Sequence, residues 1–116
     1  MAKQKVLVTG GCGYIGSHTI VDLLESGYEV ISADSLFNAD ESALDGIEAI
    51  TGQRVLNYGV DLADRAAALG VFEAQPDLAG VIHFAAFKFV GESVQNPLLY
   101  FRNNLNSLIN VLEGMA

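Results

Sequence analysis

Short apolar runs alternate along this chain with segments in which apolar residues recur at helical spacing. Residues 5–9 form a largely apolar run that ends at glycines, which is typical of a strand covered on both faces. Residues 29–34, 54–60 and 80–84 predict three further strands.

Four segments have the spacing of amphipathic helices. They cover 14–26, a stretch opened by Asn38 and Glu41 and closed at Gly52, a stretch capped by Asp61 or Asp64 that ends before Pro76, and a long final stretch from Pro97. The positions expected to be buried are Ile15, Ile20, Leu23, Leu24, Leu44, Ile47, Ile50, Leu69, Phe72, Leu98, Phe101, Leu105, Leu108 and Leu112.

Strands that alternate with helices predict an α/β fold with a parallel sheet. Right-handed crossovers then give a Rossmann-type, doubly wound sheet, truncated to about four strands in the order 3-2-1-4. A length of 116 residues allows a single domain.

The segment Thr9-Gly10-Gly11-Cys12-Gly13-Tyr14-Ile15-Gly16 follows the first strand and opens the first helix. Gly10 allows a tight turn, Gly13 lets the backbone approach a pyrophosphate, and Gly16 lets the helix pack closely. The N–H groups at the helix start would face the phosphates. The alternative, an ordinary glycine-rich turn, is disfavoured by the strand–loop–helix context.

Asp34 ends the second strand, 18 residues after Gly16. A carboxylate there can accept hydrogen bonds from a ribose diol, and it repels the extra phosphate of NADP. No Lys or Arg occurs between Lys5 and Arg54, so the sequence favours NAD over NADP. Asp34 as a simple strand-end cap is the weaker alternative.

Two later segments are further candidates. Asp61 could hydrogen-bond an adenine amino group with Leu62 against the ring, although a helix-capping role for Asp61 is equally compatible with the residues. The block His83–Ser93 leaves the fourth strand at its carboxyl end, where ligands bind in open α/β sheets. Small Ala85 and Ala86 would admit a cofactor, and Lys88 could face its oxygens or simply lie at the surface.

Composition excludes other classes of function. The formal net charge is −8 from 6 Lys+Arg and 14 Asp+Glu, which disfavours nucleic acid and anionic membranes as partners. One cysteine allows no internal disulfide and no four-ligand zinc site of the usual kind. We therefore expect no metal site. Because no apolar run is long enough for a signal core or a membrane span, we expect a cytoplasmic protein.

The motifs TGGCGYIGSHT, DSLFN, VDL, HFAAFK and VGES and the pair Asn103-Asn104 resemble the N-terminal part of the UDP-glucose 4-epimerase family, within the extended short-chain dehydrogenases/reductases. The resemblance covers essentially all 116 residues. It implies NAD as the cofactor, UDP-hexose as the substrate of the complete enzyme, and a set of cofactor contacts: Gly10, Gly13, Tyr14, Ile15, Gly16, Asp34, Ser35, Leu36, Phe37, Asn38, Ala39, Asp61, Leu62, Phe84, Ala85, Ala86, Phe87, Lys88 and Asn103. Phe87 and Phe89 are bulkier than this family's pattern suggests, which leaves the preferred sugar open.

The family's acid–base chemistry is implied to need a Ser/Thr and a Tyr-x-x-x-Lys pair after a fifth strand. No tyrosine here has a lysine four residues later, so we expect no catalytic residue in this chain and no activity from it alone. Residues 1–116 would be an NAD-binding portion, with the substrate domain and catalytic segment elsewhere. The alternatives are another extended short-chain sugar-nucleotide dehydratase or reductase, and a non-catalytic NAD-binding module.

Hydrophobic residues make up 51% of the chain, which is high for so small a domain. The segment Val81 to Phe84 is expected to form an apolar sheet edge, and the leucines of the last helix are expected to be partly uncovered. We therefore expect self-association through this edge and this helix.

Overall fold

The computed structural model describes residues 4–12, 14–35, 42–84 and 97–115, the first eight of this last range as helix backbone only. Its four strands are β1 (Lys5–Thr9), β2 (Glu29–Ala33), β3 (Leu56–Tyr58) and β4 (Leu78–His83). Its helices are α1 (Tyr14–Glu25), α2 (Ser42–Thr51), α3 (Arg65–Ala74) and α5 (Pro97–Met115).

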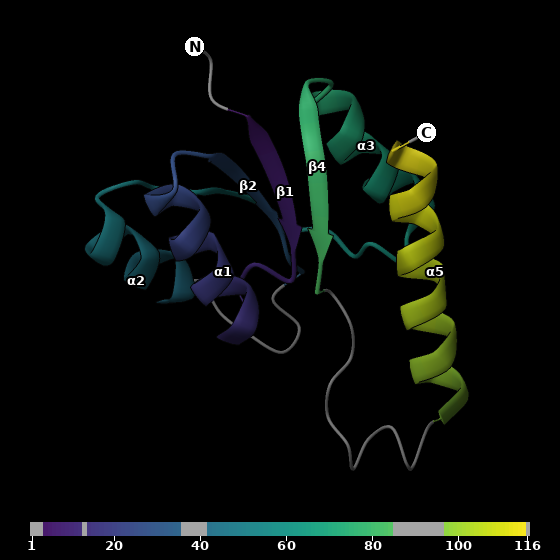
Figure 1. The fold of residues 1–116 in the computed structure, drawn as a ribbon. Helices are drawn as coiled ribbons and strands as arrows, with labels where there is room; N and C mark the ends of the chain where they lie inside the picture. The colour runs from purple at the N-terminus through teal and green to yellow at the C-terminus, as the bar shows by residue number, and fades with distance from the viewer. Residues whose placement is uncertain (1–3, 13, 36–41, 85–96, 116) are drawn as a thin grey trace.

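The strands form one parallel sheet in the order β3-β2-β1-β4, which confirms the predicted α/β, Rossmann-type topology. The chain steps from β1 outward to β2 and β3, and then returns to the other side of β1 for β4 (Figure 1). The direction of strand order therefore reverses between β1 and β4. In open α/β sheets, ligands bind at the carboxyl ends of the strands at this point.

Helices cover both faces of the sheet (Figure 1). On one face, Val6, Val8 and Val30 pack with Ile20 of α1 and with α2. On the other face, Leu7, Ile31 and Ala33 pack with α3 and with Val111 of α5. Because successive strand residues point to opposite faces, the consecutive apolar residues Val6, Leu7 and Val8 of β1, with Val30 and Ile31 of β2, supply both cores.

Two strands differ in extent from the sequence prediction. β3 is confined to three residues, Leu56–Tyr58, because only these pair with Ile31, Ser32 and Ala33 of β2. β4 starts at Leu78, two residues earlier than expected, because Leu78 pairs with Lys5 across an irregularity in the register.

The sequence predicted capping residues at the starts of α3 and α2. Asp64 is the N-cap of α3, since its carboxylate accepts hydrogen bonds from the backbone N–H groups of Ala66 and Ala67. α3 ends before Pro76, as predicted. The predicted capping pair Asn38 and Glu41 of α2 lies outside the described residues, and Ile50, expected to be buried, is 66% exposed because it lies on the outer side of α2.

Helix α5 presents a different face to the protein from the one predicted. Its buried residues in the described half are Ser107, Asn110 and Val111, whereas Leu105, Leu108 and Leu112 are 42–56% exposed. Asn110 is accommodated because its Nδ2 donates a hydrogen bond to the backbone oxygen of Leu62 (2.8 Å).

Within the described part of the chain, no helix combines the length and the apolarity needed to span a membrane.

Candidate cofactor-binding site

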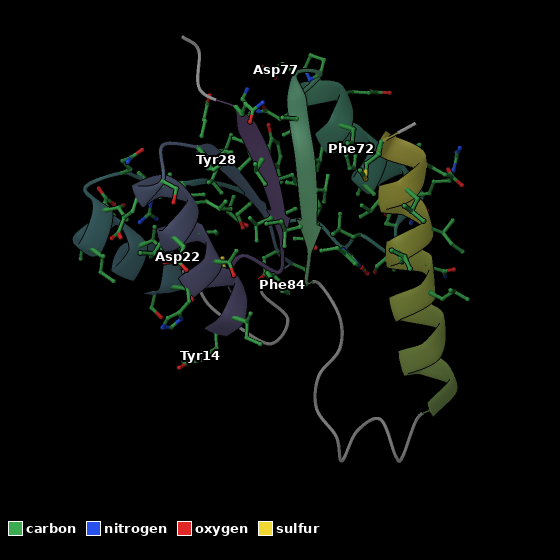
Figure 2. The ribbon with its side chains drawn as sticks, viewed as in Figure 1. Tyr14, Asp22, Tyr28, Phe72, Asp77 and Phe84 are labelled. Atoms are coloured by element: carbon green, nitrogen blue, oxygen red, sulfur yellow. The ribbon has the colours of Figure 1, made fainter. Side chains whose placement is uncertain are left out.

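The loops that follow β1, β2 and β4 are tied together at the carboxyl edge of the sheet. The backbone N–H of Gly10 donates to the oxygen of Ala33 (2.9 Å), that of Asp34 to the oxygen of Tyr58 (3.1 Å), and that of Phe84 to the oxygen of Thr9 (3.0 Å). Figure 2 shows Phe84 at the end of β4 and Tyr14 at the start of α1 on this same edge, while Asp77 lies at the opposite edge. The candidate residues that follow these strands therefore converge on one edge.

The backbone geometry favours glycine at two positions, one in the loop after β1 and one in the first turn of α1. Gly10 has a φ of 69°, in the left-handed region that favours glycine. A Cβ on Gly16 would overlap the backbone oxygen of Gly10, so the first turn of α1 packs directly on the loop. This is the close approach predicted for Gly16, whereas Gly13 lies outside the described residues.

The start of α1 carries two exposed apolar side chains. Tyr14 is 81% exposed and Ile15 is 54% exposed, although Ile15 was expected on the buried face. The Tyr14 ring lies 4.5 Å from the ring of His18, whose Nδ1 is 2.8 Å from the Tyr14 backbone oxygen. Because the first N–H groups of a helix lack intrahelical acceptors, this end of α1 can receive a phosphate group.

Asp34 connects the second strand to the glycine loop. Its Oδ2 accepts a hydrogen bond from the backbone N–H of Cys12 (3.0 Å). The carboxylate is half-buried and lies at the carboxyl end of β2, and the neighbouring Ser35 is exposed. Asp34 thus lies beside the loop that would hold the phosphates. A ribose attached to these phosphates would lie next to the Asp34 carboxylate.

Cys12 has a structural place in the loop. Its side chain is 4% exposed and belongs to the core formed by Val6, Val8 and Ile20. A thiol buried among apolar side chains is inert compared with an exposed thiolate. Cys12 therefore contributes its backbone N–H to the site, while its side chain fills the core.

The pair Asp61-Leu62 lies farther along the same edge, after β3. Asp61 is exposed, and its Oδ1 accepts a hydrogen bond from the backbone N–H of Ala63 (2.9 Å), which is a local turn rather than the helix cap. The Leu62 side chain is 4% exposed and packs in the core with Leu7 and Val71. An adenine contact from Leu62 would therefore be made by its backbone, and the side chain is not placed to cover the ring.

The end of β4 is held to β1 by a side-chain network. The Thr9 hydroxyl oxygen lies 2.6 Å from His83 Nδ1 and accepts a hydrogen bond from the backbone N–H of Phe84 (2.9 Å). Burial lowers the pKa of His83 below its ordinary value, so the ring is neutral at neutral pH. His83 acts here as a framework residue that joins the two central strands.

Several candidate contacts cannot be placed. Leu36, Phe37, Asn38, Ala39, Ala85, Ala86, Phe87 and Lys88 lie outside the described residues, and Asn103 is described only as part of the α5 backbone. Their roles, like those of the described candidates, stay predictions. Among the described residues, no three His, Cys, Asp or Glu side chains gather as a metal site requires.

The sequence reasoning missed a second layer of residues beneath the site. A Cβ on Gly11 would overlap the Ser32 hydroxyl, which donates a hydrogen bond to Asn57 Oδ1 (2.8 Å), and Asn57 Nδ2 donates to the backbone oxygen of Asp34 (3.2 Å). A polar Ser in the middle of a buried strand was the available signal, because a fully buried hydroxyl needs a partner.

The geometry fits a dinucleotide. The loop has a positive-φ glycine, a helix start packed against it without an intervening side chain, and a carboxylate bonded to it from the next strand. These are the parts needed to approach a pyrophosphate closely and to bind the adjoining ribose.

Comparison with known proteins agrees with this geometry. The family model described as GDP-mannose 4,6 dehydratase matches residues 7–116. UDP-glucose 4-epimerase uge1 of Schizosaccharomyces pombe is 53% identical over 110 residues, and UDP-glucose 4-epimerase of Bacillus subtilis is 50% identical over 110 residues. Each alignment covers 95% of this chain but only 31% and 32% of the relative, so the chain spans about a third of their length.

Solved structures give the same result. A UDP-glucose 4-epimerase from Bifidobacterium longum, in complex with NAD+ and UDP, superposes with a TM-score of 0.90 at 46% identity. One from Stenotrophomonas maltophila, with bound NAD and formylated UDP-arabinopyranose, superposes with a TM-score of 0.89 at 42% identity. Both matches cover 97% of this chain and 33% of the other.

These matches confirm the resemblance to the N-terminal part of UDP-glucose 4-epimerases that the motifs predicted. Since the family model extends over nearly the whole chain, the protein belongs to the GDP-mannose 4,6 dehydratase family.

Proposed function

We propose that this chain holds NAD for a UDP-hexose 4-epimerase. The observation that carries the proposal is the bond between the Asp34 carboxylate and the Cys12 N–H, which joins the ribose-binding position to the glycine loop. Similarity to epimerases with bound NAD over nearly the whole chain supports the same cofactor.

The chain's own residues divide the work of binding. Gly10 and Gly16 let the loop and the start of α1 approach the pyrophosphate, and Asp34 accepts hydrogen bonds from the adenosine ribose. Asp34 also disfavours NADP, because its carboxylate repels the extra phosphate of that cofactor. No Lys or Arg between Lys5 and Arg54 is available to bind this phosphate. Thr9 and His83 keep the end of β4 against β1, beside the segment that would line the nicotinamide half.

In the proposed reaction, bound NAD supplies the capacity to accept a hydride from C4 of the sugar and to return it to the opposite face. The resemblance implies that the acid–base chemistry needs a Tyr-x-x-x-Lys pair, and no such pattern occurs in this chain. The 116-residue chain alone is therefore inactive, and its contribution is the cofactor grip.

Calorimetric titration with NAD and NADP tests the cofactor, and interconversion of UDP-galactose and UDP-glucose by the protein at its full natural length tests the activity. We expect saturable binding of NAD, weaker binding of NADP, and a lower NAD to NADP preference in Asp34→Ala. NADP binding as tight as NAD binding would contradict the cofactor assignment. NAD binding without epimerisation would favour a non-catalytic module.

A dehydratase is the second candidate, and the description of the matching family model favours it. The two activities differ in their product, because a dehydratase releases water and yields a 4-keto-6-deoxy sugar. Incubation with a UDP-hexose and mass analysis of the sugar nucleotide distinguishes the two outcomes: epimerisation leaves the mass unchanged, and dehydration lowers it by one water.

We also propose that α5 packs against a second copy of this chain. Its described half exposes five large apolar side chains, namely Leu105, Leu108, Ile109, Leu112 and Met115. Such a row on one helix is larger than the scattered apolar residues of an ordinary surface. Sedimentation equilibrium over a wide concentration range tests the proposal, and a monomer at the highest concentration would contradict it.

A further inference from the structure

Two polar side chains, Ser32 and Asn57, form hydrogen bonds next to the carboxyl end of β2, and neither is a proposed cofactor contact. We call these hydrogen bonds the polar bridge. Ser32 and Asn57 are register partners on the parallel strands β2 and β3. The Ser32 hydroxyl donates to Asn57 Oδ1 (2.8 Å), and Asn57 Nδ2 donates to the backbone oxygen of Asp34 (3.2 Å). One amide side chain thus joins the centre of β2 to the residue that follows its end.

The bridge closes a ring with the glycine loop. Gly11 lies so close to the Ser32 hydroxyl that a Cβ would overlap it, and the next residue, Cys12, donates its N–H to Asp34 Oδ2. Starting from the loop, the contacts run through Ser32, Asn57 and Asp34 and return to the loop. Each member is therefore held by two others.

The end of the strand ladder explains why this bridge matters. β3 ends at Tyr58, whose oxygen accepts the last sheet hydrogen bond from the Asp34 N–H (3.1 Å). At that point the strand ladder ends, and the Asn57 side chain, on the neighbouring strand, donates a hydrogen bond to the backbone oxygen of Asp34. The Asn57 side chain thus connects β3 to the peptide group that follows the last residue bonded by the strand ladder.

We propose that Asn57 is a positioning residue that fixes the Asp34 carboxylate and thereby sets the preference for NAD over NADP. This inference rests on the proposed function. Because no Lys or Arg lies between Lys5 and Arg54, discrimination against the extra phosphate depends on where the Asp34 charge is held. A displaced carboxylate would bind the ribose less well and repel that phosphate less.

The test compares Asn57→Leu, which has a similar volume but neither hydrogen bond, with the original protein at its full natural length. We expect the ratio of NAD affinity to NADP affinity to fall by about 5- to 30-fold in calorimetric titrations, as expected for one or two polar links. Ser32→Ala, which leaves the Asn57 amide held only at Asp34, is expected to change the ratio in the same direction by less. It decides the question if Asn57→Leu does not fold.

Gln75→Ala is the matched control. Gln75 is also a half-buried amide with one donated bond, to the Tyr58 hydroxyl (3.0 Å), and one accepted bond, from Lys5 Nζ (2.9 Å), but it lies at the opposite edge of the sheet. It should lower thermal stability without changing the NAD to NADP ratio. A purely structural role for Asn57 would give that same result in Asn57→Leu and would overturn the inference.

A double-mutant cycle shows whether Asn57 acts through Asp34. In an Asp34→Ala background, Asn57→Leu should leave the NAD to NADP ratio unchanged, because the positioned charge is already absent. An equal drop in both backgrounds would overturn the inference while leaving the proposed function intact. Absence of NAD binding in the original protein would overturn both.

Discussion

The glycine loop and helix α5 both adjoin the same sheet, but they use side chains in opposite ways. In the loop, glycines have no side chain and allow close contact between backbone atoms. The backbone N–H of Cys12 donates a hydrogen bond to the Asp34 carboxylate. In α5, the polar Ser107 and Asn110 face inward, and the large apolar Leu108 and Leu112 face outward.

The contrast follows from what each region meets. The loop lies where β1, β2 and β4 end, so its own chain provides the partners that hold it in one arrangement. Helix α5 packs against α3, and a Cβ on Gly114 would overlap the ring of Phe72. Figure 2 shows Phe72 beside α5. We therefore propose a ligand as the partner of the loop and a second protein surface as the partner of the outer face of α5.

The largest effect is expected from Gly16→Ala. The added Cβ would overlap the Gly10 oxygen, which belongs to the backbone and cannot rotate away, so α1 must move off the loop. We expect the free energy of unfolding to fall by about 1–3 kcal/mol and NAD binding to be lost, as checked by denaturant titration and calorimetry.

Gly46→Ala is the control for this change. Gly46 is exposed within α2 and a Cβ there meets no atom within 4 Å. Alanine should stabilise the helix by about 0.5–1 kcal/mol and leave NAD binding unchanged. Equal losses in the two variants would show that the loop has no special requirement for glycine.

The next effect concerns the buried polar face of α5. Asn110→Ala removes the donor to the Leu62 oxygen and leaves that carbonyl without this partner, so we expect a loss of about 1–3 kcal/mol in the free energy of unfolding. Asn106→Ala, at an exposed position one turn away, should change stability by less than about 0.5 kcal/mol. If the two variants were equally stable, α5 would not be anchored through its polar side.

The pH dependence of stability probes the loop edge through His83. Because burial lowers its pKa, the unfolded chain binds a proton more readily than the folded chain once the pH falls to the ordinary pKa of about 6.5. Stability from this group is therefore complete above that pH and declines from there down to the pKa in the folded chain.

His83→Asn keeps an acceptor near Thr9 but does not titrate, so its free energy of unfolding should decline less than that of the original protein between pH 7 and 5. Urea titrations across this range measure the difference. Parallel curves for the two proteins would mean that His83 does not contribute to acid sensitivity.

The smallest effect on stability is expected on the outer face of α5. Leu108→Gln combined with Leu112→Gln removes apolar surface that is already exposed, so the free energy of unfolding should change by less than about 0.5 kcal/mol per residue. Self-association, measured by sedimentation, should weaken strongly. Unchanged association would direct attention to the edge of β4.

Local patterns predicted much of this molecule correctly. The run at residues 5–9 and the glycine spacing after it predicted β1, α1 and the tight approach of Gly16, because these depend on neighbours close in sequence. The short extent of β3 was not predictable in this way, since Val55 and Val60 continue the apolar pattern but are not paired with residues of β2.

The candidate site shows the same division. Asp34 was recognised from its distance to Gly16, yet the bond to the Cys12 N–H and the support from Asn57 join residues 22 and 23 positions apart. Leu62 was assigned to an adenine contact from its place after Asp61, but packing against Leu7 and Val71 directs its side chain into the core.

The sequence by itself determined the alternation of strands and helices, the strand order, the glycine loop and the acidic residue that follows β2. These features follow from periodicity, from the conformational freedom of glycine and from the handedness of crossovers, all of which act locally. Only the tertiary structure decided which face of α5 is buried and which residues support Asp34. Both depend on contacts between distant segments, because a buried polar side chain is stable only where another part of the chain provides its hydrogen-bond partner.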